Sequence, residues 1–241
     1  MRLLKFISDL HLERREGIIT FTKNHYNKSL IIPGDIGSPL KQNYWDFMDY
    51  VSDKFEKVYF TTGNHEYWNN NKITINQIDN LIEDKIVNYN NEYFLNNKVI
   101  HHDEYEIIGT ILWSYPKLNI KNSFDFKNIH YDEFNNLSPL IMRELYIENM
   151  LWLTNKINEN NNNKIVVTHY LPSYDFCMKH HNYLMVRSLF ASSLDYLIKP
   201  PVKYWLFGHT HDNFMRKKNN VYCCVNALGR KKKYDLKNIY L

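Results

Sequence analysis

Five apolar segments of this chain each end in aspartate, asparagine or histidine, and this repeated ending constrains the fold more than any other feature. LLKFI is followed by SDLH, SLII by PGD, KVYF by TTGNH, KIVV by TH and YWLF by GHTH. A single histidine in a loop is usually solvated or hydrogen-bonded, so the argument depends on the repetition. The residues concerned are Asp9, His11, Asp35, Asn64, His65, His169, His209 and His211.

These segments alternate with stretches of helical spacing, which predicts an α/β fold with parallel strands and outer helices. Strands are expected at residues 3–7, 29–32, 57–61, 99–101, 106–113, 164–168, 204–207, 221–227 and 238–241. Helices are expected around residues 44–55, 75–82, 139–157 and 186–197, whereas the stretch from residue 204 onward suggests antiparallel strands. The carboxyl ends of strands in open α/β sheets line the ligand crevice, so the residues named above are expected to converge.

The types of these residues predict a metal site. Asp9 and Asp35 supply carboxylates, Asn64 supplies an amide oxygen, and the remaining candidate ligands are the imidazoles of His11, His169, His209 and His211. This set exceeds what one tetrahedral ion needs and contains no thiolate. Mixed oxygen and nitrogen ligands suit Mn, Fe, Co or Zn, and two ions that share one carboxylate are used for in-line displacement at phosphorus.

Composition and length exclude several other classes of protein. A chain of 241 residues suits one domain over residues 1–241. The three cysteines lack CxxC spacing, and the adjacent Cys223 and Cys224 would point to opposite faces of a strand, which favours reduced thiols in the cytoplasm. Charged residues interrupt the first apolar segment, and no apolar run is long enough to cross a bilayer. We therefore expect a cytoplasmic protein without membrane association.

The motifs SDLHL, PGDIG, GNHE, THY and GHTH resemble, in order, the five signature blocks of calcineurin-like metallophosphoesterases, in particular the small single-domain bacterial-type members. The resemblance implies a β-sandwich of two mixed sheets flanked by helices, in place of the single parallel sheet expected from alternation alone. It also implies that Asp9, His11, Asp35 and His211 hold one metal ion. Asp35 would bridge to a second ion held with Asn64, His169 and His209, and His65 would donate a proton or position phosphate.

The activity implied is a metal-dependent hydrolysis of small phosphate monoesters or diesters, in which a hydroxide bridging two metal ions attacks phosphorus. The cofactors expected are two divalent transition-metal ions, Mn before Fe, Zn, Co or Ni. Asp35 is followed by Ile36 without the arginine of phosphoprotein phosphatases, and Ser38 stands where purple acid phosphatases carry a metal-bound tyrosine. Two alternatives stay open: a nuclease acting on DNA or RNA ends, and a non-catalytic interaction module that binds metal for stability.

The remaining candidates are weaker. Residues 115–136 are rich in aromatic side chains and form either a self-packed loop or a lid whose rings stack on substrate. Tyr170 is expected to contact substrate. Glu66 is expected to cap the helix begun near Lys72 in preference to holding a group beside the site. The other histidines are expected to be structural or solvent-facing, with a reservation for His180 and His181. The net charge is +4, and basic residues are concentrated at 216–218 and 230–233. Such runs are usually solvated, and no motif in the sequence supports a nucleic-acid partner.

Overall fold

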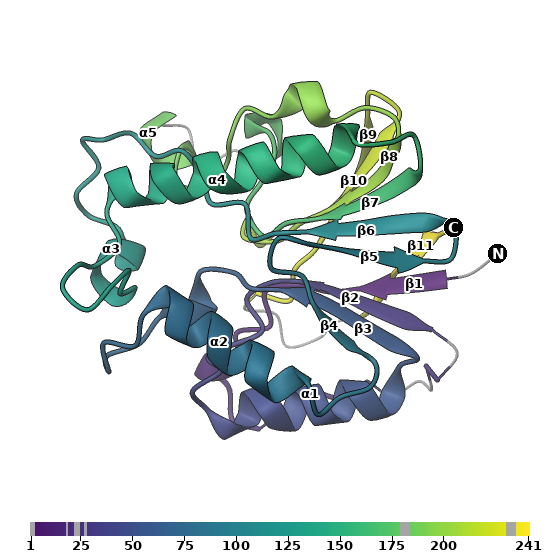
Figure 1. Cartoon of the computed structure of the whole chain (residues 1–241), viewed down its shortest axis with the longest axis horizontal. Coiled ribbons are helices and arrows are strands. Elements are labelled where there is room, and N and C mark those ends of the chain that lie inside the picture. The colour runs from purple at the N-terminus through teal and green to yellow at the C-terminus, as the bar shows by residue number, and fades with distance from the viewer. Residues whose placement is uncertain (1–2, 18, 22–24, 27, 179–183, 230–234) are drawn as a thin grey trace.

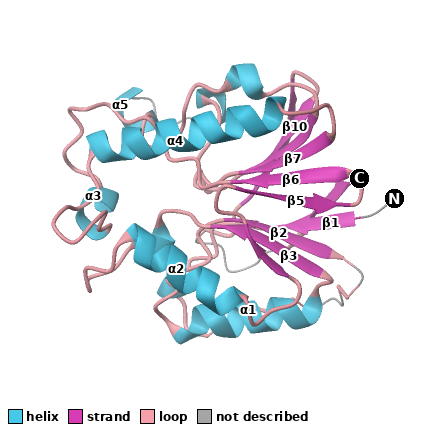
Figure 2. Ribbon diagram, viewed as in Figure 1, coloured by secondary structure: helices cyan, strands magenta, loops and turns pink. Residues whose placement is uncertain are grey.

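A computed structural model of the chain describes residues 3–17, 19–21, 25–26, 28–178, 184–229 and 235–241. His180, His181 and the basic run 230–233 lie outside these residues. Within the described part of the chain, the strands form two sheets that pack face to face, with helices on both outer faces (Figures 1 and 2). The α/β sandwich of two mixed sheets implied by the sequence motifs is therefore confirmed.

The first sheet contains five strands in the order β11-β1-β2-β3-β4. Strands β1 to β4 are parallel and β11 runs antiparallel to β1. Their bounds are β1 Leu3–Phe6, β2 Ser29–Pro33, β3 Lys57–Thr61, β4 Glu92–Phe94 and β11 Lys237–Tyr240. The outer face of this sheet is covered by α1, Gln42–Lys54, and α2, Ile75–Ile86 (Figure 1).

The second sheet contains six strands in the order β5-β6-β7-β8-β10-β9. Its inner strands are parallel, and the edge strands β5 and β9 run antiparallel to their neighbours. The strands are β5 Lys98–His102, β6 Tyr105–Gly109, β7 Asn163–Val167, β8 Val202–Leu206, β9 Asn213–Lys218 and β10 Val221–Asn226. The long helix α4, Pro139–Asn158, packs on the outer face, capped by Ser138 and with Pro139 in its first turn.

Alternation of side chains along each strand produces two cores. Phe6, Ile31 and Val167 belong to the cluster between the sheets, whereas Leu30 and Val166 belong to the larger cluster under the helices. Both faces of the central strands are therefore apolar, as is expected for parallel strands that helices cover. Cys223 and Cys224 follow the same rule, since they fall in different clusters, and all three cysteines are free thiols, as expected.

Three expectations about secondary structure are wrong. No helix spans 186–197: α5 is only Leu184–Arg187, Ala191 forms a bridge with Leu171, and a 3-10 turn covers Asp195–Leu197. The expected strand 106–113 ends at Gly109. The stretch after residue 204 is not wholly antiparallel, because β8 pairs with β10 in parallel while β9 and β10 form the hairpin.

Short elements complete the chain. They are α3, Phe124–Asn128, and the 3-10 turns η1, Leu12–Arg14, η2, His65–Tyr67, η3, Tyr174–Phe176, and η4, Asp195–Leu197. In Figure 1, α3 lies at the end of the sandwich toward which the parallel strands point, and both termini are marked at the opposite end. None of the helices that the structure describes is long and apolar enough to cross a bilayer.

Candidate metal centre

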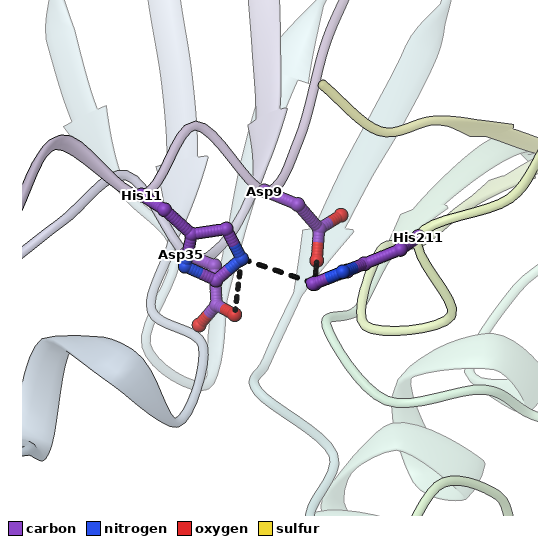
Figure 3. Close-up of side chains that lie close together, drawn as sticks. All are labelled: Asp9, His11, Asp35 and His211. Carbon is purple, nitrogen blue, oxygen red and sulfur yellow. Dashed lines mark hydrogen bonds and ion pairs between the residues drawn. The ribbon is translucent and has the colours of Figure 1, made fainter. Parts of the chain in front are cut away.

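The residues that follow β1, β2 and β8 form a compact cluster in the structure (Figure 3). Asp9, His11, Asp35 and His211 each place one donor atom within 4.8 Å of the others. The Nε2 atom of His11 lies 3.0 Å from Nε2 of His211 and 3.7 Å from Oδ2 of Asp35, and Nε2 of His211 lies 3.3 Å from Oδ1 of Asp9. Four residues from three strand ends thus point at one small volume.

A second cluster shares Asp35 with the first. Asp35, His169 and His209 place donor atoms within the same 4.8 Å limit. Nε2 of His169 lies 3.4 Å from Oδ1 of Asp35, 3.2 Å from Nδ1 of His209 and 3.2 Å from Oδ1 of Asn64. All seven expected ligands therefore lie together, with Asp35 between the two groups.

The backbone at these positions adopts an uncommon conformation. Asp9, His11, Asp35, His209 and His211 all have φ between 50° and 64°, the left-handed region. Residues other than glycine occupy that region at a cost of about 1 kcal/mol each, and such strain gathers at functional sites. The chain thus turns sharply after these strands, and the turns direct the side chains toward the strand ends.

Gly34, Gly63 and Gly208 let the strand ends approach each other closely. A Cβ atom on Gly34 would lie 2.6 Å from Nδ1 of His169, and one on Gly208 would lie 2.8 Å from Oδ2 of Asp9. On Gly63 it would lie 2.7 Å from Nε2 of His169 and would also collide with Oδ1 of Asp35. A side chain at any of the three would displace the side chain of a candidate ligand.

The protonation of the cluster fits a bound cation. Nδ1 of His169 is 2.9 Å from the carbonyl oxygen of Pro33, to which it can only donate, so Nε2 keeps its lone pair. Burial lowers the pKa of His169 to about 4 and that of His209 well below its usual value. Both imidazoles are therefore neutral near pH 7, as metal ligands must be.

The surroundings of Asp35 also suit a bound cation. Burial and the neighbouring carboxylates of Glu66 and Asp9 raise its pKa well above the usual value. Its Oδ2 is buried and has no hydrogen-bond partner. A buried carboxylate oxygen without a partner is costly, and a cation between the two clusters would remove that cost.

Glu66 holds the loops that carry two of the expected ligands. It is fully buried, and its carboxylate accepts hydrogen bonds from the backbone N–H groups of Asp35, at 3.1 Å, Ile36, at 2.6 Å, and Gly63, at 2.7 Å. The α2 helix is instead capped by Thr74 and Gln77, so Glu66 does not act as a helix cap. Of the two roles considered from the sequence, the structure favours holding a group beside the site.

Asp125 joins α3 to the candidate ligand Asn64. Its Oδ1 accepts hydrogen bonds from Nδ2 of Asn64, at 2.8 Å, and from Nε1 of Trp68, at 2.7 Å. An amide that donates through Nδ2 to Asp125 must turn Oδ1 the other way, and Oδ1 of Asn64 faces His169. Sequence reasoning missed Asp125, because its position in the aromatic-rich segment carried no motif.

His65 lies at the edge of the cluster between a carboxylate and an aromatic ring. Its Nδ1 is 3.0 Å from Oε1 of Glu13, and the same oxygen is 3.3 Å from Nδ1 of His11. The His65 ring stacks on Trp68 with centroids 3.9 Å apart and planes inclined by 27°. Burial opposes ionisation of Glu13, but the hydrogen bonds from His11 and His65 outweigh it and hold the Glu13 pKa below its usual range. Glu13 was also missed, although it stands two residues after His11.

A cavity of about 660 Å³ opens above the clusters. Its lining includes Asp35, Asn64, His65, His209 and His211, together with residues 122–125. Part of the 115–136 segment is thus a pocket wall, while Ile120, Phe126 and Ile129 in the same segment are buried in the core. The packing of aromatic and apolar side chains within the segment is confirmed, and a lid whose rings stack on substrate stays a prediction.

Tyr170 does not reach the pocket. It is fully buried, and its ring packs 4.3 Å from that of His209, so the expected substrate contact is wrong. Of the histidines outside the motifs, His25 stacks on Phe55 and His102 bonds to the hydroxyl of Tyr59, as expected of structural residues.

Comparisons with known proteins agree with the fold and the motifs. Residues 3–213 match the model of the calcineurin-like phosphoesterase family. The chain is 26% identical over 257 residues to the uncharacterised protein L509 of Acanthamoeba polyphaga mimivirus, covering 95% of this chain and 91% of that protein. Among solved structures it is similar to the phosphopantetheinyl hydrolase PptH of Mycobacterium tuberculosis, with a TM-score of 0.69, 17% identity and coverage of 99% and 95%. The family match spans nearly the whole chain, which therefore belongs to the calcineurin-like phosphoesterase family.

Proposed function

We propose that this protein is a dinuclear metal-dependent phosphoesterase that hydrolyses small phosphate mono- or diesters. The observation that carries the proposal is the position of Asp35, which belongs to both ligand clusters and has one buried oxygen that accepts no hydrogen bond. Asp9, His11 and His211 would complete the first metal site, and Asn64, His169 and His209 the second. Two divalent ions there would activate water near neutral pH and neutralise charge on the phosphate oxygens.

The residues of the chain contribute orientation and proton transfer. Neutral His169 is oriented by Pro33, and Asn64 is oriented by Asp125. His65 lines the pocket with Nδ1 held by Glu13, which leaves Nε2 for a substrate oxygen. Because Nδ1 already donates to the Glu13 carboxylate, Nε2 carries a proton only in the imidazolium form of His65. We assign that form the donation of the Nε2 proton to the leaving oxygen, a role that typically accelerates such reactions by ~10²–10⁴-fold.

The two alternatives receive less support. Of the described residues that line the pocket, Arg14 is the one permanent cation, and Lys218 in the basic run pairs with Asp175 and Asp195. A polyanionic nucleic acid is therefore not favoured over a small ester. The pocket remains open to the clusters, which also weakens the non-catalytic alternative.

The proposal is tested by metal removal and restoration. We expect exhaustive chelation to abolish hydrolysis of simple aryl phosphates and Mn²⁺ to restore it better than Mg²⁺, because Mg²⁺ avoids imidazole-rich sites. Metal analysis should show no bound ion after chelation and two ions per chain after restoration. Full activity in protein shown to be free of metal would refute the mechanism.

A further inference from the structure

The pocket extends beyond the candidate ligands into an apolar region. Trp68 and Phe124 line it beside His65, and Met178, Leu189 and Phe190 also line it. The Phe190 ring lies 4.7 Å from that of His209, whereas Trp68 stacks on His65. Apolar side chains therefore stand on both the His65 side and the His209 side of the metal centre. We refer to Trp68, Phe124, Met178, Leu189 and Phe190 as the ring subsite.

Three rings in series form one wall of this subsite. The His65 and Trp68 centroids are 3.9 Å apart, and the Trp68 and Phe124 centroids are 6.0 Å apart with planes inclined by 33°. Trp68 is held in place by its hydrogen bond to the buried Asp125, the neighbour of Phe124. The wall is therefore tied to the metal centre through Asn64, so that its position relative to a reacting phosphate is set.

The exposure of Phe124 is informative because this residue lines the pocket. Phe124 is 71% exposed, but Phe134 in the same segment is 91% exposed and does not line the pocket. Isolated exposed apolar side chains are normal on protein surfaces. Phe124 differs because it follows Trp68 in the series of rings that begins at His65, and a further ring can continue that series in an offset or tilted geometry.

Charge in this part of the pocket does not favour an anion. The guanidinium of Arg14 lies 5.7 Å from the Trp68 ring, and its Nε is 3.3 Å from Oε1 of Glu13. Arg14 is thus already paired with a carboxylate, and Asp125 adds a second acidic group to the same wall. A highly charged leaving group would find little here to compensate its desolvation.

We infer that the ring subsite binds an uncharged planar ring carried by the leaving group of the phosphate ester. This inference rests on the proposed function, which places the phosphate at the two ligand clusters. The whole cavity, at about 660 Å³, has the size of a small-molecule site. Stacking of an added ring on Phe124 would extend the series His65–Trp68–Phe124, and alanine substitution of such stacking residues typically costs binding several-fold to a hundredfold.

The test compares Phe124→Ala with the control Phe134→Ala on Mn²⁺-loaded protein. Three substrates are used: 2-naphthyl phosphate, a linear alkyl phosphate with the same number of carbons, and ethyl phosphate. We expect Phe124→Ala to lower kcat/KM for the naphthyl ester about tenfold, mainly through KM, and to leave ethyl phosphate unchanged. Each variant is compared with wild type on the same ester, so differences in leaving-group reactivity cancel. Phe134→Ala should leave all three values unchanged.

Binding of 2-naphthylmethyl phosphonate, measured by calorimetry, reads out the subsite without any turnover. We expect affinity about tenfold weaker in Phe124→Ala than in wild type, with Phe134→Ala unchanged. If no ester is hydrolysed but this difference in affinity is found, the proposed function fails and the ring subsite stands. The inference is overturned if Phe124→Ala binds the phosphonate as wild type does, if all three esters lose activity equally, or if the alkyl ester loses as much as the naphthyl ester.

Discussion

Asp35 and His65 are joined by a hydrogen bond, 2.9 Å from the His65 amide to Oδ1 of Asp35, yet their proposed roles differ. Asp35 is common to both ligand clusters, whereas His65 belongs to neither and groups with Glu13 and with His11 of the first cluster. The roles of these two hydrogen-bonded residues can therefore be distinguished by measuring which substitution removes metal and which lowers only the reaction rate.

We expect Asp35→Asn to lose both metal and activity, because it removes the one carboxylate that the two clusters share. His65→Gln should retain two metal ions while kcat falls ~10²–10⁴-fold for alkyl esters. The fall should be smaller for nitrophenyl esters, whose leaving group scarcely needs a proton. The measurements are metal content by elemental analysis and kcat for an aryl and an alkyl ester. Loss of metal from His65→Gln would identify His65 as a ligand, and an equal fall for both esters would assign it to phosphate positioning.

At the residue scale, the sequence predicted the members of the cluster but not the residues that orient them. The eight residues found at strand ends lie together because the parallel strands of both sheets end at the same end of the sandwich. Glu13 contacts His65, which lies 52 positions away in the sequence. Asp125 contacts Asn64, which lies 61 positions away. Such partners depend on how loops pack, and neither hydrophobic period nor a motif encodes that packing.

At the scale of elements, the short helix α3 contacts both the pocket and the candidate metal centre. It has five residues, begins after the cap Ser123, and places Phe124 in the pocket and Asp125 under Asn64. Because one oxygen of Asp125 accepts from both Asn64 and Trp68, this helix orients a candidate ligand and an aromatic wall together.

We expect Asp125→Ala to weaken metal binding about 10–100-fold, as is typical when a group that orients a ligand is removed. Asp125→Asn should restore most of the affinity, because its amide oxygen can still accept from both donors. Metal affinity is measured by titration of the metal-free protein with Mn²⁺, and the loss should fall on one of the two ions, the one held by Asn64.

Asp79→Ala is the control for loss of a hydrogen-bonded carboxylate that is partly buried. Asp79 accepts from the hydroxyl of Tyr67 and from Asn96, neither of which is a candidate ligand. Its removal should lower stability without changing metal affinity. Equal weakening in Asp79→Ala and Asp125→Ala, or no weakening in Asp125→Ala, would contradict the orienting role.

The elements that were missed or misassigned share a weak local signal. Strand β9, NFMRKK, carries charged residues at half of its positions because it is an edge strand, and β4 and α3 are too short to show a period. The spacing of Phe190, Leu194 and Leu197 resembles a helix, but Leu194 and Leu197 are buried through irregular backbone that pairs with the segment after β7. Long apolar strands and the capped helix α4 were correct because local pattern and tertiary packing agree there.

At the scale of the whole molecule, the free energy of unfolding should depend on pH through Glu92 on β4. Glu92 is 6% exposed, and neither of its carboxyl oxygens has a hydrogen-bond partner. Burial, with a smaller effect of Asp49, raises its pKa from 4.5 to about 9. The folded protein therefore holds this proton more tightly than the unfolded chain does. Its stabilising effect is complete below pH 4.5 and is lost as pH rises toward about 9.

We expect Glu92→Gln to remove this pH dependence. The stability of wild type relative to the variant should fall by up to about 1.4 kcal/mol per pH unit between about pH 5 and about pH 9. Denaturant unfolding of both proteins at several pH values gives the slope. Well below pH 4.5 both side chains are neutral in the folded and unfolded states, so the relative stability should level off there. A parallel pH dependence in the two proteins would show that Glu92 ionises normally.

The left-handed corners that carry five of the candidate ligands have a consequence for hydrogen exchange. The amide of His209 donates to Oδ1 of Asp9, and that of His65 donates to Oδ1 of Asp35, so the carboxylates of two candidate ligands also protect backbone N–H groups. Strained corners open more readily than regular strand when nothing cross-links their side chains. The exchange rates of these two amides should therefore slow together when cations join the strand ends, while amides in the middle of β7 keep a common rate. Two backbone protons would thus report whether the centre is filled.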